Sequence, residues 1–219
     1  ESGRQSIDAF LQHNDRFLDL GKLAIAAILV PLEDRKRLFD SRPNWYKELF
    51  NYLSTRFDDF SRNRLSIITF NYDRSLEQFL LTALSNSYQG KTRDQCWHQM
   101  SFIPIIHLHG DLGILPSNDM DTGDDVRDYD GSLSREALKI AMRRIRIIHE
   151  EVDQSSEFQK ARTLFSEADI IAFLGFGFDP INLKRLQLRQ RVFKTAQRDD
   201  KWRIYGTSFE LGEARKACV

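Results

Sequence analysis

Three short polar segments hold the side chains of this sequence that could do chemistry together. They are Asn-Tyr-Asp at residues 71–73, His-Leu-His-Gly-Asp at residues 107–111 and Gly-Phe-Gly-Phe-Asp at residues 175–179. An imidazole titrates near neutral pH and can serve as a general base, and an amide can donate to and accept from a water or a hydroxyl group. Brought together, these groups could bind a polar ligand and activate water against it.

Each polar segment directly follows a short apolar run, at residues 66–70, 103–106 and 169–174. Short, β-branched and nearly continuous apolar runs predict strands that are buried on both faces, as in a parallel sheet. In open parallel sheets, ligands bind beyond the carboxyl ends of the strands. We therefore expect the three polar segments to meet in one site.

Within this site, the spacing of the side chains suggests different roles. His107 and His109 are two residues apart, so in a strand they share a face, although each could also be a satisfied polar residue at a strand end. Gly110 would let a ligand approach the backbone, which favours His109 as the general base. Asp73 is expected to cap the helix that follows it. Asn71 has no such structural need and could hold a water or a ribose hydroxyl.

A metal site is the alternative that the carboxylates leave open. Asp73, Asp111 and Asp179 could supply oxygen ligands to Mg²⁺ for phosphoryl transfer, but each also lies where a helix or turn would use it locally. Residues 118–131 contain six Asp and a single Arg. Their spacing does not fit a calcium-binding loop, so a mobile, solvated loop is expected and no metal ligands are assigned.

Composition limits the classes of function. Lys plus Arg and Asp plus Glu are both 32 in 219 residues, so the net charge is zero, and direct nucleic-acid binding is not predicted. Two cysteines, Cys96 and Cys218, cannot build a disulfide framework or a four-thiolate zinc site. No apolar run approaches the roughly 20 residues of a membrane span, and no signal peptide is visible. A cytoplasmic protein that does not enter a membrane is expected.

The order of elements predicts an α/β fold. Residues 1–62 are expected to be helical, with helices beginning at Ser6 and at Leu20. Residues 63–219 are expected to form a Rossmann-like, doubly wound, mostly parallel sheet with a helical insert near 118–165. The further elements predicted are helices from Leu76, at 132–152, 155–168 and 181–196, a polar connection at 85–97, and a last strand at 202–206.

The chain resembles the SIR2-like, sirtuin-related NADase domains of bacterial anti-phage defence proteins. The resemblance lies in the order and spacing of the segments at 69–73, 107–111 and 175–178, together with the stretches 6–11 and 21–26. The resemblance covers nearly the whole chain and implies a single SIR2-like domain over residues 1–219. It implies an NAD⁺ hydrolase that cleaves the nicotinamide–ribose bond to give nicotinamide and ADP-ribose. Such an enzyme acts as an antiviral, abortive-infection effector by depleting NAD⁺, which is its substrate, and no further cofactor is expected.

The resemblance also assigns roles to individual residues. Asn71 would position the water or substrate near the anomeric carbon, and His109 would be the catalytic base. The residues expected to contact NAD⁺ are Thr69, Phe70, Asp73, Gly110, Gly175, Gly177 and Phe178. Glycosidic cleavage passes through an oxocarbenium-like transition state and nicotinamide leaves as a neutral molecule, so a fixed water and a base suffice without a metal.

Two departures from the family qualify this interpretation. The zinc module of deacetylating sirtuins is missing, so protein deacylation is not expected. The family's first strand and its Gly-rich loop should precede Ser6, so the chain is expected to be a fragment, with a sensor or regulatory region or partner outside it. A homo-oligomer is expected. The alternatives are a non-catalytic nucleotide-binding or assembly module and, with less support, a metal-dependent phosphoesterase.

Overall fold

The computed structural model describes residues 11, 14–40, 44–53, 56–117, 123–147, 155–188 and 203–207. The chain divides into two compact units, residues 1–149 and 150–219. The helix predicted to begin at Ser6 lies almost wholly outside the described residues, as do the parts of the acidic segment at 118–122 and of the basic helix from residue 189 onward.

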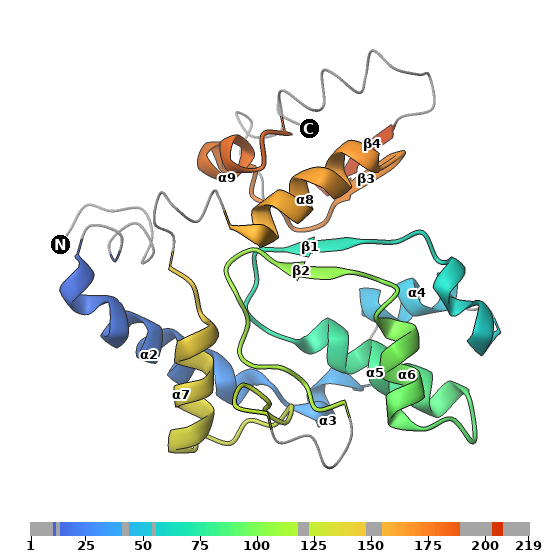
Figure 1. Cartoon of the computed structure of the whole chain (residues 1–219), viewed down its shortest axis with the longest axis horizontal. Helices are drawn as coiled ribbons and strands as arrows, with labels where there is room; N and C mark the ends of the chain where they lie inside the picture. The colour runs from blue at the N-terminus through green and yellow to red at the C-terminus, as the bar shows by residue number, and fades with distance from the viewer. Residues whose placement is uncertain are drawn as a thin grey trace. The chain divides into compact units, whose positions relative to one another are not determined.

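The first unit begins with helices, as predicted (Figure 1). In chain order they are η1 (Asp15–Phe17), α2 (Leu18–Leu29), η2 (Val30–Leu32), α3 (Arg35–Leu38), α4 (Trp45–Tyr52) and η3 (Phe57–Arg62). Two of them start at side-chain caps: Asp34 accepts from the backbone N–H of Lys36, and Asn44 accepts from that of Lys47. Such caps satisfy amide groups that have no partner within the helix.

Two parallel strands follow, β1 (Ile67–Thr69) and β2 (Ile105–His107), and Figure 1 shows them side by side. The connection between them contains α5 (Ser75–Ser87) and α6 (Arg93–Met100). The register pairs Ile67 with Ile105 and Thr69 with His107. All residues of both strands are half-buried, so the prediction of strands buried on both faces is wrong for this pair.

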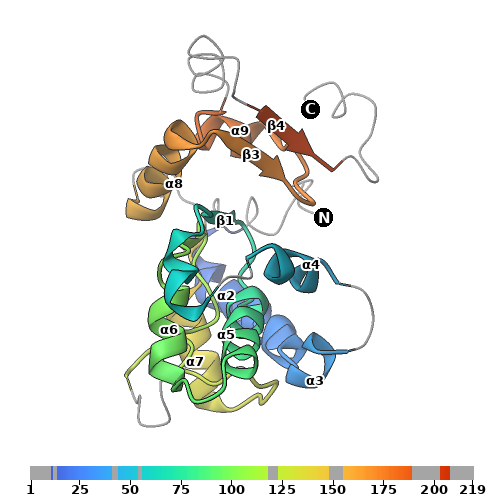
Figure 2. The same cartoon turned by 90° about the vertical axis from the view of Figure 1, so that its right-hand side faces the viewer.

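The second unit repeats the strand–helix–strand order with α8 (Ser156–Glu167), β3 (Ile170–Phe173), α9 (Pro180–Arg185) and β4 (Arg203–Gly206), seen in Figure 2. β3 and β4 are parallel, with Ile170 paired to Arg203 and Phe173 paired to Gly206. The observed architecture is thus α/β with parallel strand pairs, as predicted. The described residues form two two-stranded sheets, and a doubly wound sheet is not established by them.

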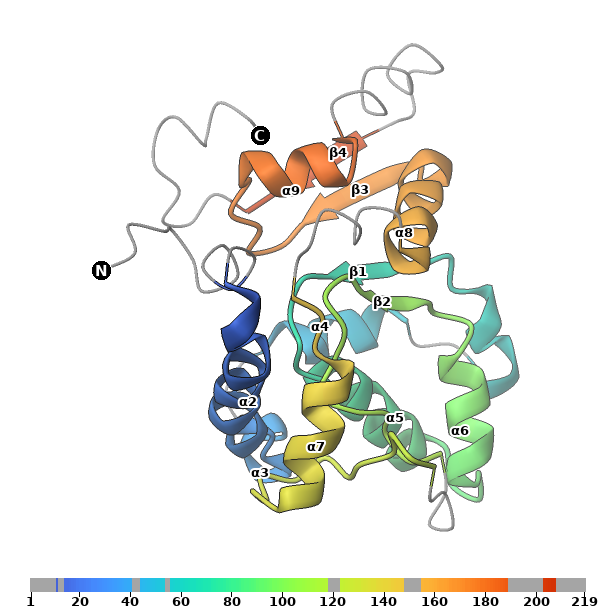
Figure 3. The same cartoon turned by 60° about the vertical axis from the view of Figure 1, so that its left-hand side comes forward.

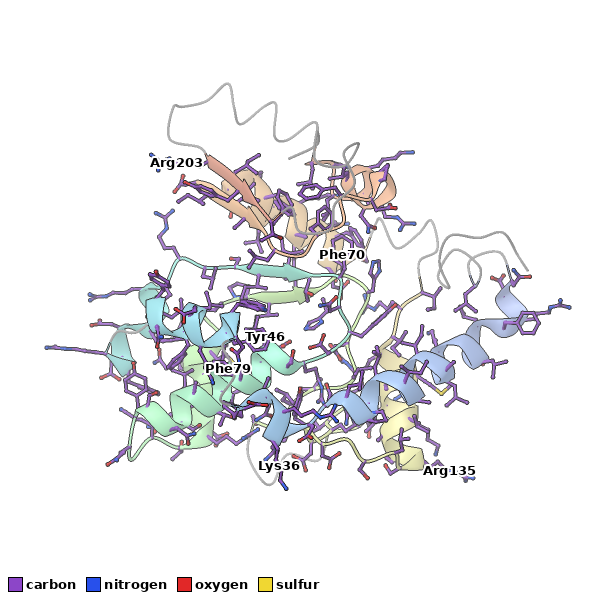
Figure 4. The ribbon with its side chains drawn as sticks, turned by 180° about the vertical axis from the view of Figure 1, so that it is seen from behind. Lys36, Tyr46, Phe70, Phe79, Arg135 and Arg203 are labelled. Atoms are coloured by element: carbon purple, nitrogen blue, oxygen red, sulfur yellow. The ribbon has the colours of Figure 1, made fainter. Side chains whose placement is uncertain are left out.

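Two apolar cores hold the first unit together. One surrounds α5, whose Phe79, Leu80 and Leu84 are buried against α4, η3 and α6. Figure 4 shows Tyr46 and Phe79 next to each other, and their ring centroids are 5.5 Å apart. The other core lies where α2 meets α7 (Arg135–Arg144), which run alongside each other in Figure 3.

A buried network of ion pairs connects distant segments of the first unit. Glu33, between η2 and α3, is 1% exposed and accepts from two arginines, Arg74 and Arg127, that are 2% and 7% exposed. Arg74 also donates to the carbonyl oxygens of Arg127 and Asp128, at 2.7 and 3.0 Å. The network therefore ties the helical N-terminal part and the 123–130 segment to the residue that precedes α5.

This network corrects the prediction that residues 118–131 form a solvated loop. In the described part, Val126 bridges to Ile114, Tyr129 is buried, and Asp125 forms ion pairs with Arg143 and Arg144. From residue 123 onward, Arg127 and Tyr129 are buried while most of their neighbours are exposed, so the segment is anchored at these two side chains. It contains no helix before α7, which follows the cap residue Ser134.

Two helix predictions also differ from the structure. The polar connection predicted at 85–97 is wrong from residue 93 onward, where α6 (Arg93–Met100) begins at a capping box between Thr92 and Gln95. The helix predicted at 132–152 ends at Arg144, because Ile145 is extended and the chain then runs beside the strand ends. Among the residues that the structure describes, none of the helices combines the length and the apolar character that a membrane crossing requires.

Candidate functional site

The carboxyl ends of β1 and β2 bring two of the predicted site segments together. Thr69 and His107 are register partners, and the N–H of Leu108 donates to the carbonyl oxygen of Thr69 at 2.9 Å. Asn71 and His109 each follow a register partner by two residues. The structure therefore places them at the same end of the strand pair, as the sequence predicted for a parallel sheet.

Side chains from both strands hold the backbone of Asn71. Its N–H donates to Oγ1 of Thr69 at 3.0 Å, and its carbonyl oxygen accepts from Nδ1 of His107 at 2.7 Å. The residue is exposed. Thr69, which was expected to contact NAD⁺, therefore uses its hydroxyl oxygen as an acceptor for the backbone N–H of Asn71.

His107 is held at both ring nitrogens. Nδ1 faces the carbonyl oxygen of Asn71, and Nε2 lies 2.5 Å from Oε1 of Glu77 in the first turn of α5. Burial alone would lower the pKa of His107, but the hydrogen bond and charge of Glu77 outweigh it. Together with the Asn71 carbonyl and the charge of Asp111, they raise the pKa of His107 to about 9. At neutral pH this ring is a cation that donates twice, so it is a poor general base.

His109 has a different environment. It is 5% exposed, and its ring centroid lies 5.4 Å from that of Phe70 and 6.5 Å from that of Tyr72. Phe70, labelled in Figure 4, directly follows β1, and these two aromatic residues stand on either side of Asn71 in the sequence. The backbone of His109 is held as well, because its carbonyl oxygen accepts from the N–H of Arg146 at 2.8 Å.

The structure gives a reason for a glycine at position 110 that the sequence did not suggest. Its φ of 78° is in the left-handed region, and a Cβ at this position would overlap the carbonyl oxygen of Arg144. The space beside Gly110 is therefore filled by this chain's own backbone where it leaves α7. The sequence predicted that a ligand would approach the backbone here, and the group that approaches it in the structure is the carbonyl of Arg144. Contact of Gly110 with NAD⁺ stays a prediction.

The three aspartates of the metal alternative all have local partners. Asp73 accepts from the N–H and the hydroxyl of Ser75, the first residue of α5, so it satisfies an amide at the helix start as predicted, although the N-cap residue is Arg74, which makes no side-chain cap hydrogen bond. Asp111 pairs with the guanidinium of Arg144 through both carboxylate oxygens, at 2.5 and 2.6 Å. Asp179 accepts from the first turn of α9.

Within the described ranges, no group of three or more His, Cys, Asp or Glu side chains is arranged to hold a metal ion. The contacts of the three aspartates are thus local ones: Asp73 and Asp179 each bind the start of a helix, and Asp111 forms an ion pair with Arg144.

The third predicted segment lies in the second unit, between β3 and α9. Gly175 has a φ of 61°, and its N–H donates to Oγ1 of Thr207, directly after β4, at 2.9 Å. Gly177 is exposed, whereas Phe178 is 4% exposed and packs its ring against Phe173 at 5.4 Å. The turn follows a strand and precedes a helix, as predicted, and the ring of Phe178 belongs to an aromatic cluster of this unit.

Sequence reasoning missed two groups that shape the site. Glu77 fixes the ring of His107, and its only signal was an acidic residue in the first turn of a helix. Glu33 anchors Arg74 beneath the Asn71 segment, and no local pattern could have paired residues that are 41 positions apart. Both act through contacts between distant parts of the chain.

The geometry thus places Asn71 and His109 after the same end of a parallel strand pair. No protein-family model, no curated protein sequence and no solved structure matches the chain.

Proposed function

We propose that this protein is an NAD⁺ glycohydrolase that releases nicotinamide from NAD⁺ and leaves ADP-ribose. The observation that carries the proposal is the placement of Asn71 beside the His109 segment, at the carboxyl ends of paired parallel strands. Asn71 is exposed on a backbone held from both sides. In parallel sheets this is the end at which ligands bind.

The proposed chemistry needs few groups. The amide of Asn71 orients a water or a ribose hydroxyl at the anomeric carbon, and His109 accepts the proton as water attacks. His107 is excluded as the base because both of its ring nitrogens already donate. Phe70 precedes Asn71 in the sequence and Asp73 follows it by two residues. The expected contacts of Gly175, Gly177 and Phe178 with NAD⁺ rest on the sequence motif alone.

The remaining parts of the proposal concern the setting of the enzyme. A Rossmann-like, doubly wound architecture is supported by two parallel strand pairs, each with helices in its connections. An anti-phage role that depletes NAD⁺, a cytoplasmic location, a homo-oligomer and a sensor region outside these residues rest on the resemblance of the sequence motifs alone.

The test is nicotinamide release from NAD⁺ by the wild-type protein and by the Asn71→Ala and His109→Ala variants, with EDTA present. His98→Ala is the matched control, because His98 is an exposed histidine on α6. Each site variant is expected to lose activity by at least about 100-fold while its far-UV circular dichroism stays unchanged, and the control is expected to keep wild-type activity. Full activity in both site variants would refute the proposal.

A non-catalytic nucleotide-binding module is the second candidate. It is favoured by the burial of His109, which at 5% exposure presents little of its ring to a ligand. Calorimetry with NAD⁺ and with ADP-ribose separates the candidates. Heat from binding without nicotinamide release favours the module, whereas release that depends on His109 favours the hydrolase.

A further inference from the structure

The backbone of Asn71 is held by a pair of side chains that are themselves register partners. Thr69 from β1 accepts its N–H, and His107 from β2 donates to its carbonyl oxygen. Both peptide groups that flank the Asn71 side chain are therefore fixed to the end of the strand pair. Its side chain, in contrast, belongs to an exposed residue.

The ring of His107 is fixed in turn from another element. Glu77, in the first turn of α5, accepts from Nε2 at 2.5 Å, and the side chains of His107 and Glu77 are only 8% and 15% exposed. A buried charge-assisted hydrogen bond of this kind is short and directional. The contact makes a continuous chain from the helix through the imidazole to the Asn71 carbonyl.

We propose that His107 is a positioning residue of the NAD⁺-cleaving site, which Glu77 orients and which sets the direction of the Asn71 side chain through its carbonyl oxygen. This inference rests on the proposed function. His107 does not transfer a proton, since Nδ1 and Nε2 are both occupied by acceptors. The charged groups that act on the ring are Glu77 from α5 and Asp111 from the segment after β2.

The kinetic test compares two replacements of His107. Phenylalanine keeps a planar ring and removes both hydrogen bonds, whereas asparagine keeps a donor close to the position of Nδ1. His107→Phe is expected to lower kcat about 10- to 100-fold with a smaller change in KM. The reason is that the Asn71 amide would no longer be held in the geometry that the reaction requires, and misplacing a reacting group lowers the rate. His107→Asn is expected to recover a large part of that kcat. His98→Phe on α6 is the matched control, with wild-type kcat.

A second readout is independent of activity. Labelling asparagine at its carbonyl ¹³C and tyrosine with ¹⁵N marks only the Asn71–Tyr72 and Asn51–Tyr52 bonds, because no other asparagine precedes a tyrosine. A ¹³C-detected spectrum of these two bonds can be followed from pH 6 to pH 10. The Asn71 carbonyl signal is expected to shift as His107 loses its proton near pH 9, and the Asn51 signal is the internal control.

Two variants decide the meaning of that signal. In His107→Phe the Asn71 transition should disappear, and in Glu77→Gln it should move to lower pH, because the neutral amide no longer stabilises the imidazolium. An Asn71 signal that is the same in the wild type and in His107→Phe overturns the proposal whatever the activity.

A lost transition combined with unchanged kcat in His107→Phe also overturns it, since the contact would then be structural only. The outcome for the proposed function is separate. A wild-type protein that releases no more nicotinamide than Asn71→Ala refutes the hydrolase, and with it the role of His107 in that reaction, even where the Asn71 signal follows His107.

Discussion

The buried network around Glu33 predicts a large loss of stability on a small chemical change. Glu33 accepts from the backbone N–H and two guanidinium nitrogens of Arg74, and from Nη2 of Arg127. The carboxylate and both guanidinium groups are almost fully buried, and burial is the leading cause of the lowered pKa of Arg127. Glu33→Gln keeps the shape and one acceptor oxygen but removes the only negative charge that these contacts place between the two cations.

The magnitude follows from the cost of leaving buried charges unpaired. Removing one partner of a buried ion pair costs about 3–5 kcal/mol, and here one substitution affects two arginines. A folded protein has a total stability of about 5–15 kcal/mol, so roughly a fifth or more of it is expected to disappear. For a chain of this size the melting temperature is expected to fall by roughly 6–20 °C.

Urea unfolding, monitored by tryptophan fluorescence, measures this loss of stability. The comparison requires that the free energy of unfolding falls with urea concentration at the same slope in both proteins. The matched control is Glu136→Gln, because Glu136 lies 3.9 Å from Lys139 with both side chains more than half exposed. The control is expected to change the free energy of unfolding by no more than about 0.5 kcal/mol. A Glu33→Gln variant as stable as this control would refute the reasoning.

Two further predictions concern the strand ends. The pKa of His107 is raised from 6.5 to about 9 in the folded protein, so its contribution to stability is complete below pH 6.5 and is lost as the pH rises through 9. The wild type should thus lose up to about 3 kcal/mol relative to His107→Phe between pH 6.5 and 10 in urea titrations, and a constant difference would contradict the assignment of the Glu77 contact. Gly110→Ala should destabilise the protein more than Gly90→Ala, since both glycines have a φ of 78° but only at Gly110 would a Cβ meet the backbone of Arg144. Backbone strain accounts for about 1–3 kcal/mol in each variant, so equal melting temperatures would show that the Arg144 contact is absent.

The strands were predictable because their signal is local. The segments predicted as strands, at residues 66–70, 103–106, 169–174 and 202–206, each overlap one of the four strands of the described residues. Their parallel pairing followed from the helices between them. The contact of Asp73 with the first residue of α5 was predictable for the same reason, since the two residues are near neighbours in the sequence.

Local signals also explain two errors. α6 has only two buried residues, Cys96 and Met100, so apolar periodicity did not mark it, although Thr92 and Gln95 form a capping box. α7 was predicted too long because its apolar spacing continues past Arg144. The chain leaves the helix there to pack its backbone against Gly110 and His109, and tertiary contacts override helix periodicity.

Apolar runs and the helices between them were enough to predict where the strands lie, that they are parallel, and that Asn71 and His109 follow the same end of the β1–β2 pair. The partner of each polar side chain at these ends is visible only in the folded chain. The fold pairs His107 with the carbonyl of Asn71, Asp111 with Arg144, and Glu33 with arginines 41 and 94 positions away. The physical reason is that backbone propensity and apolar periodicity act between near neighbours in the chain, whereas a buried charge must find its partner wherever the fold brings one.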